Sequence, residues 1–113
     1  MSTETTLPVT LAEIEAAAEV LKPVIARTPV EHSRVLSQHV GAEVFLKCEN
    51  MQRAGSFKVR GAYVRMSKLS DEEKARGVVA ASAGNHAQGV AQAASHLGIK
   101  ARIYMPLGVA LPK

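Results

Sequence analysis

The chain has 113 residues, of which 47% are hydrophobic, so it is long enough for one globular domain and too apolar for a disordered chain. Its 14 basic and 10 acidic residues give a net charge of +4. The basic residues are scattered and aromatics are few, which argues against a nucleic-acid-binding surface. No apolar run approaches the ~20 residues that span a bilayer, and residues 1–8 do not resemble a signal peptide. We therefore expect a cytoplasmic protein that binds neither nucleic acid nor membrane.

Cysteine and histidine usage predicts neither a disulfide nor a metal site. Cys48 is the only cysteine, which fits a reducing compartment, and we expect it to be a small core residue. His86 and His96 are separated by a spacing that does not put them on one helix face.

The first predicted element is a helix over residues 11–21. Thr10 and Glu13 form a capping-box pattern, apolar residues recur at helical spacing, and Pro23 follows. The short alternating run over residues 43–47 contains β-branched and aromatic side chains, which predicts a strand.

The rest of the chain predicts three helices and two strands. Ser56 is a suitable N-cap for a helix to about residue 69, and a short helix from Ser70 ends at Gly77. The apolar run 78–81 predicts a strand covered on both faces. A helix over residues 85–97 is followed by a strand over 101–105. The expected buried face of the 85–97 helix consists of Ala87, Val90, Ala91, Ala94 and Leu97.

Alternating strands and helices predict an α/β fold, an open parallel sheet of βα units with right-handed crossovers. In such sheets ligands bind beyond the carboxyl ends of the strands. The segments 55–62 and 82–89 each lead into a helix, so we expect both at that edge, forming one site. A sheet this small leaves unpaired edges and a thin core, so we expect these residues to be part of a longer protein.

Lys58 is the leading candidate for covalent chemistry. A lysine forms a Schiff base with a carbonyl cofactor as a neutral amine, and partial burial by Phe57, Val59 and Ala62 would favour that form. The alternative is a solvated helix lysine. The glycines and small residues of the segment 55–62 favour the chemical role.

The segment 82–86 offers N–H groups at a helix start for a carboxylate, together with the side chains of Asn85 and His86. The alternative is an ordinary turn in which Asn85 bonds its own backbone. The residues alone leave both interpretations open. Arg53 and Arg60 are weaker candidates: the first fits a solvated loop charge, and the second fits either a partner of an acidic group or a helix-surface residue.

Two motifs resemble one enzyme family. SFKVRGA, residues 56–62, preceded by ENMQR, residues 49–53, resembles the cofactor-attachment site of the serine/threonine dehydratases, pyridoxal-phosphate enzymes of the tryptophan-synthase-β-like fold, also called fold type II. SAGNHAQGVA, residues 82–91, resembles the substrate and cofactor loop of the same family. The resemblance runs from about Val9 to Lys113 and is nearest to the branch that acts on threonine. It implies that residues 1–113 are the N-terminal part of a catalytic domain, with the remainder and any regulatory domain absent.

The resemblance also implies a cofactor, a substrate and a role for each site residue. The cofactor would be pyridoxal 5'-phosphate, and the substrate a small amino acid that loses its β-hydroxyl and amino groups. Lys58 would be the Schiff-base lysine and then the base that takes the α-proton. Phe57 would pack beside the cofactor ring, and Asn85 would hydrogen-bond its hydroxyl. The substrate carboxylate would be held by Ser82, Gly84 and His86.

Departures from the family pattern define the alternatives. Serine racemases carry a hydroxyl where this chain has Ala83, so the resemblance implies elimination rather than racemisation. Ala54 stands where many relatives have threonine. The family's glycine-rich phosphate loop and the polar residue facing the pyridine nitrogen are not among these residues. A non-catalytic truncated product is therefore the second hypothesis, and a homo-oligomer is expected for the full-length protein.

Overall fold

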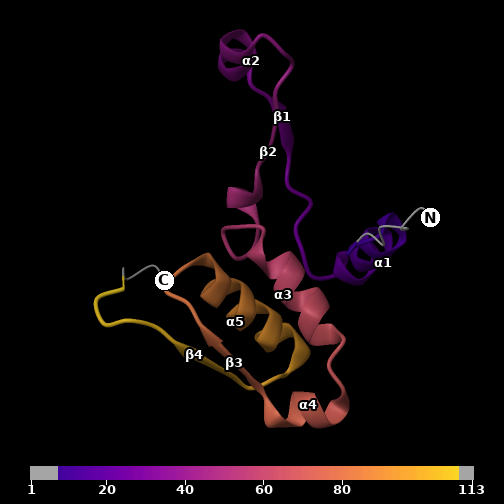
Figure 1. Ribbon diagram of the computed structural model, residues 1–113, viewed down its shortest axis with the longest axis vertical. Helices are drawn as coiled ribbons and strands as arrows, with labels where there is room; N and C mark the ends of the chain where they lie inside the picture. Colours follow the sequence, from indigo (N-terminus) through magenta and orange to yellow (C-terminus); the bar gives the residue numbers. More distant parts are fainter. Residues whose placement is uncertain (1–7, 110–113) are drawn as a thin grey trace, which may run out of the picture.

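The structure is a computed structural model that describes residues 8–109; the expectation about residues 1–8 falls almost wholly outside them. The chain alternates helices with short strands (Figure 1). In order, the elements are α1 (Leu11–Leu21), β1 (Val30–His32), α2 (Arg34–Val40), β2 (Phe45–Lys47), the 3-10 turn η1 (Glu49–Met51), α3 (Lys58–Ser67), α4 (Asp71–Arg76), β3 (Val78–Ala81), α5 (Asn85–Leu97) and β4 (Ala101–Tyr104).

The predicted parallel βα arrangement is confirmed in the C-terminal half. β3 pairs with β4 in parallel, with Val78 opposite Ala101 and Ala81 opposite Tyr104. α5 packs on this strand pair and α3 packs on α5, so that α5 lies between the strands and α3 (Figure 1). The core between them contains Met66, Val90, Ala93, Ala94 and Ile99.

Two predictions about burial are wrong in this half. β3 is covered on one face, not two, because its burial alternates and Val79 is 72% exposed. On α5, Ala91 is exposed whereas Ala93 is buried. The predicted buried face of α5 therefore included one residue, Ala91, that lies outside the face covered by α3 and the strands.

Residues 30–47, which contain β1, α2 and β2, form an arm that projects away from the rest of the molecule (Figure 1). β1 and β2 pair antiparallel, and α2 connects them. This antiparallel pair is a sheet separate from β3–β4 and was not predicted, and the predicted strand 43–47 is shortened to three residues. No residue of β1, α2 or β2 is buried.

β1 and α2 were not predicted, although α2 carries recognisable signals at both ends. Ser33 caps its start by accepting the N–H of Leu36, and Gly41 ends it in the left-handed region with φ of 71°. Cys48 follows β2 and is half-buried, with its thiol 3.7 Å from the carbonyl oxygen of Leu46. It lies at the base of the arm and not in the core. Within residues 8–109, no helix is both long and apolar enough to cross a membrane.

Candidate functional site

Lys58 is the first residue of α3 and follows the loop that leaves η1. The Ser56 hydroxyl accepts the Lys58 N–H at 3.3 Å, so Ser56 supports the helix start although Phe57 occupies the N-cap position. The Lys58 amine lies 5.2 Å from the centroid of the Phe57 ring, and that ring is 58% exposed. Val59 is fully buried, but its neighbour Lys58 is exposed. The predicted partial burial of Lys58 is therefore wrong within the described chain.

The second segment follows β3 directly, as predicted for a loop at the carboxyl end of a parallel strand. Ser82 donates its N–H to the Tyr104 carbonyl at 3.0 Å, which continues the strand pairing by one residue. Its hydroxyl accepts the N–H groups of Gly84 at 3.2 Å and Ala87 at 3.3 Å. Ser82, rather than Asn85, thus satisfies the start of α5.

Asn85 and His86 are the first two residues of α5, and both are exposed. Their N–H groups lie in the first helical turn, where no partner exists within the helix. The first turn of α5 therefore offers two N–H groups to a ligand, in addition to the amide of Asn85 and the imidazole of His86.

Gly89 brings the two segments together. A Cβ atom on Gly89 would lie 2.9 Å from the carbonyl carbon of Lys58 and 3.0 Å from its Cβ, so α5 contacts the backbone of Lys58 directly. Asn85 precedes Gly89 by four residues and lies on the same helix face. α3 and α5 lie side by side and begin at the same end of the pair (Figure 1). Lys58 and Asn85 thus lie at the same end of the α3–α5 pair.

The remaining predicted positions do not share one hollow. Ala83 and Ser82 line a shallow hollow of about 420 Å³ beyond the ends of β3 and β4, which Tyr104 also lines. His86 borders a different hollow, with Ala62 of α3 and Val90 of α5. The segment 55–62 does not follow a parallel strand, because it leaves an antiparallel strand through η1. That part of the prediction is wrong.

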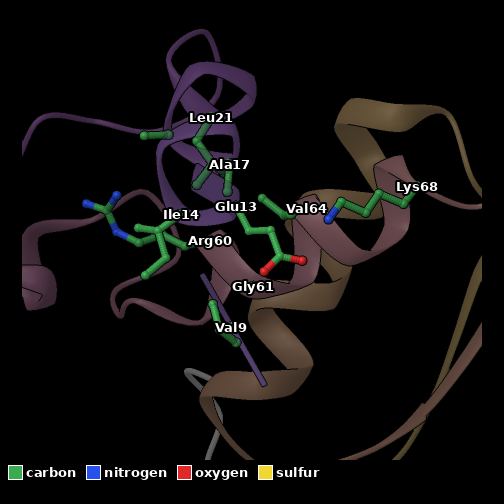
Figure 2. A pocket seen from close by; sticks show the side chains of 10 residues that line it. Val9, Glu13, Ile14, Ala17, Leu21, Arg60, Gly61, Val64 and Lys68 are labelled. Carbon is green, nitrogen blue, oxygen red and sulfur yellow. The ribbon is translucent and has the colours of Figure 1, made fainter. Parts of the chain in front are cut away.

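A larger, apolar groove of about 550 Å³ lies between α1 and α3, and of the predicted candidates it is lined by the weaker one, Arg60. Figure 2 shows Ile14, Ala17 and Leu21 of α1 facing this groove. The Lys68 amine points toward the Glu13 carboxylate, and Lys68 contributes to lowering the pKa of Glu13 after the hydrogen bonds from Thr10. This groove is separate from the candidate site.

An ion pair next to Lys58 was missed as a feature of the site. Arg60 donates from Nε and Nη2 to the two carboxylate oxygens of Glu49, each at 2.8 Å. The buried Thr28 donates its hydroxyl to the same carboxylate at 2.6 Å. These hydrogen bonds, the Arg60 pair first, lower the pKa of Glu49 from its usual 4.5 to about 2. The sequence left Arg60 undecided because the two residues are eleven positions apart across an irregular loop.

Groups that could hold a metal ion are absent from residues 8–109, where no three His, Cys, Asp or Glu side chains cluster suitably. The chemistry available at the shared end of α3 and α5 is that of an amine, an aromatic ring and amide donors. Such a set suits an organic ligand with a carbonyl, a flat ring and acidic oxygens.

A family described as "Pyridoxal-phosphate dependent enzyme" matches residues 21–113. The L-threonine ammonia-lyase of Thermotoga maritima is 55% identical over 105 residues, which are 93% of this chain and 26% of that protein. The biosynthetic L-threonine dehydratase of Lactococcus lactis is 54% identical over 84% of this chain and 23% of its own length. The catabolic L-threonine dehydratase of Staphylococcus aureus is 56% identical over 87% of this chain and 29% of its own.

Among solved structures, maize serine racemase is similar with a TM-score of 0.80 and 42% identity, over 88% of this chain and 31% of that one. The chain therefore spans about a quarter of the length of the curated relatives that it matches. Both motifs of the candidate site lie within the matched residues.

Proposed function

Because the chain belongs to the family of pyridoxal-phosphate-dependent enzymes, we propose that the protein is a threonine ammonia-lyase, also called threonine dehydratase. It converts L-threonine to 2-oxobutanoate and ammonia, and L-serine to pyruvate. The observation that carries the proposal is the contact of Gly89 with the Lys58 backbone, which brings the attachment lysine and the Asn85 loop to one place. The names and identities of the three curated relatives support the choice of substrate.

The residues present fit pyridoxal phosphate. Lys58 has an exposed amine for its aldehyde, and the exposed Phe57 ring lies beside that amine. Asn85 stands at the start of α5 on the face that meets Lys58, and its amide would hydrogen-bond a ring substituent of the bound cofactor. The family resemblance implies that the residues that would hold the phosphate lie outside residues 1–113.

When bound, pyridoxal phosphate serves as an electron sink for negative charge at the substrate α-carbon. We assign Lys58 two tasks, attachment of the cofactor and removal of the α-proton by its free amine. Phe57 and Asn85 orient the ring. The carboxylate of the amino acid is held by Ser82, Gly84 and His86.

We rank the three proposed carboxylate contacts by the hydrogen bonds that each residue already makes. Ser82 accepts two N–H groups through its oxygen but keeps its own hydroxyl proton to donate. The N–H of His86 has no partner within α5, and its imidazole is exposed. Gly84 already donates its N–H to Ser82, so it is the weakest donor of the three.

The test uses the intact protein supplied with pyridoxal phosphate and L-threonine. We expect Lys58→Ala to abolish 2-oxobutanoate formation, whereas Lys68→Ala, which removes an exposed lysine at the other end of α3, leaves it unchanged. Borohydride reduction followed by peptide mapping should find the cofactor on Lys58. Full turnover by the Lys58→Ala variant would refute the assignment.

Serine racemase is the second candidate, favoured by the similarity to the maize enzyme. Ala83 argues against it, because a methyl group has no proton to return to the opposite face of the α-carbon. Incubation with L-serine separates the two: pyruvate as the main product supports the lyase, and D-serine as the main product supports the racemase.

We further propose that the protein is cytoplasmic, homo-oligomeric, binds neither nucleic acid nor membrane, and acts in isoleucine biosynthesis. The biosynthetic relative supports the last point, while the catabolic relative supports degradation instead. Inhibition of the intact enzyme by isoleucine would favour the biosynthetic role, and insensitivity the catabolic one. Light scattering of the intact protein measures its oligomeric state.

A competing proposal is that residues 1–113 alone are non-catalytic. Turnover by that polypeptide would exclude it.

A further inference from the structure

A charged pair, Glu49 and Arg60, joins the two ends of the segment that carries Lys58. Glu49 lies in η1, before the segment, and Arg60 lies in the first turn of α3, after it. Two hydrogen bonds of 2.8 Å join the guanidinium to the carboxylate, a bidentate geometry that fixes direction as well as distance. The Glu49 side chain is only 14% exposed and that of Arg60 32% exposed, so water screens the pair incompletely.

A second contact holds the same segment from within. Gln52 is 4% exposed, and its amide donates to the Ala26 carbonyl and accepts the Ala26 N–H, both at 2.8 Å. Beyond Gln52 the chain turns at Gly55, where φ is 70°, and enters α3. The loop is therefore attached at Glu49 and Gln52 on one side of Lys58, and at Arg60 on the other.

Arg60 does not face the apolar groove that it borders. Figure 2 shows its guanidinium turned away from Glu13, the acidic residue of that groove. It meets Glu49 instead, on which Thr28 also converges. Neither Glu49 nor Arg60 is among the residues expected to touch the ligand, but Arg60 is only two positions from Lys58 in the same helical turn.

We propose that the Glu49–Arg60 pair is a positioning device that sets where α3 begins and so holds the Lys58 amine in place for the cofactor aldehyde. Gly89 restricts Lys58 from the side of α5, and the ion pair restricts it from the side of η1. The inference rests on the proposed role of Lys58. A reactive amine tolerates little displacement, and misplacement by about 1 Å costs roughly a hundredfold in rate.

The test measures labelling of Lys58 in the intact protein. Pyridoxal phosphate is added, samples are reduced with borohydride over time, and the pyridoxyl label on each lysine is quantified by peptide mass spectrometry. We expect Glu49→Gln and Arg60→Lys to slow labelling of Lys58 by roughly ten- to a hundredfold, since each loses the bidentate charged geometry. Labelling of the exposed Lys22 and Lys100 should be unchanged.

Two control variants separate positioning from stability. Ile99→Val removes a methylene from the core, far from the loop in sequence, and should leave Lys58 labelling at the wild-type rate. Glu19→Gln breaks the exposed Glu19–Lys22 pair and should likewise leave Lys58 labelling at the wild-type rate. The double variant Glu49→Arg with Arg60→Glu exchanges the two charges. It should restore part of the lost rate of Lys58 labelling, because it keeps one charged contact between η1 and α3.

The outcomes distinguish the two proposals. Wild-type protein that labels Lys58 no faster than Lys22 would overturn the proposed function and this inference together. Wild-type protein that labels Lys58 selectively, with Glu49→Gln unchanged or no slower than Ile99→Val, would overturn the positioning role alone. Selective labelling that is lost in Glu49→Gln and partly regained in the double variant supports both.

Discussion

Gly89 determines how closely α5 approaches Lys58, and its substitution gives a test at the scale of one residue. In Gly89→Ala the new Cβ would meet backbone atoms of Lys58 at 2.9 to 3.0 Å, which forces α3 and α5 apart. We expect a loss of about 1–3 kcal/mol in the free energy of unfolding, measured with urea. Gly61→Ala is the matched control, since nothing lies within 4 Å of the added Cβ. The higher helix propensity of alanine should raise the free energy of unfolding by about 1 kcal/mol. Equal effects of the two variants would contradict the contact.

The titration of Glu49 gives a second prediction for a single residue. Arg60 first, and Thr28 next, lower the pKa of Glu49 from 4.5 to about 2 in the folded protein. A carboxyl whose folded pKa is depressed contributes stability that is complete above the unfolded pKa and disappears as pH falls through the folded one.

We therefore expect Glu49→Gln to lower the free energy of unfolding by about 1–2 kcal/mol at neutral pH, after allowance for the partly exposed Arg60. The difference from wild type should shrink as pH falls from 4.5 to about 2, because the wild-type carboxyl then becomes neutral. Urea unfolding across that range measures it. A difference independent of pH would show that the charge of Glu49 contributes nothing.

Among the elements, helix caps were the signals that the sequence carried most clearly. Thr10 with Glu13 and Ser70 with Glu73 both form the reciprocal capping box. In each pair the glutamate accepts the N–H of the cap residue, and this hydrogen bond is the main cause of its lowered pKa. Local caps are readable because all of their partners lie within four residues.

The cap of α4 can be tested as an element. Ser70→Ala removes the hydroxyl that accepts the Glu73 N–H, so we expect the amides of α4 to exchange hydrogen roughly fivefold faster, the effect of about 1 kcal/mol. The amides of α5 should keep their rates. Ser95→Ala, at an exposed position inside α5, is the control and should slow the hydrogen exchange of α5 amides slightly. Unchanged exchange in α4 would mean that the cap is not needed.

At the scale of the whole molecule, the described chain is more extended than a self-sufficient domain. Its radius of gyration is 17.6 Å, against roughly 13 Å for a compact domain of this length. Its accessible surface is 8565 Å², against roughly 6,000 Å² for a folded monomer of this mass. The arm is among the exposed parts, with Val35 73% and Phe45 60% exposed.

This imbalance predicts uneven stability in the polypeptide of residues 1–113. We expect amides of the arm, residues 30–47, to exchange hydrogen near the rate of an unfolded peptide, because the arm buries no side chain fully. Amides of α3 and α5 should be protected by their shared core. In the intact protein the arm should become protected as well. Equal protection of arm and core in the short polypeptide would contradict the prediction.

The sequence by itself determined α1, α3, α4, α5, β3 and β4, and the two motifs, because capping patterns, helical periodicity and short apolar runs act between near neighbours. It did not determine the antiparallel arm, the bare face of β3 or the Glu49–Arg60 pair. Each of these depends on which distant segments meet: β1 with β2, α5 with one face of β3, and η1 with α3. The meeting of Lys58 with α5 was decided in the same way, by the absence of a side chain at Gly89.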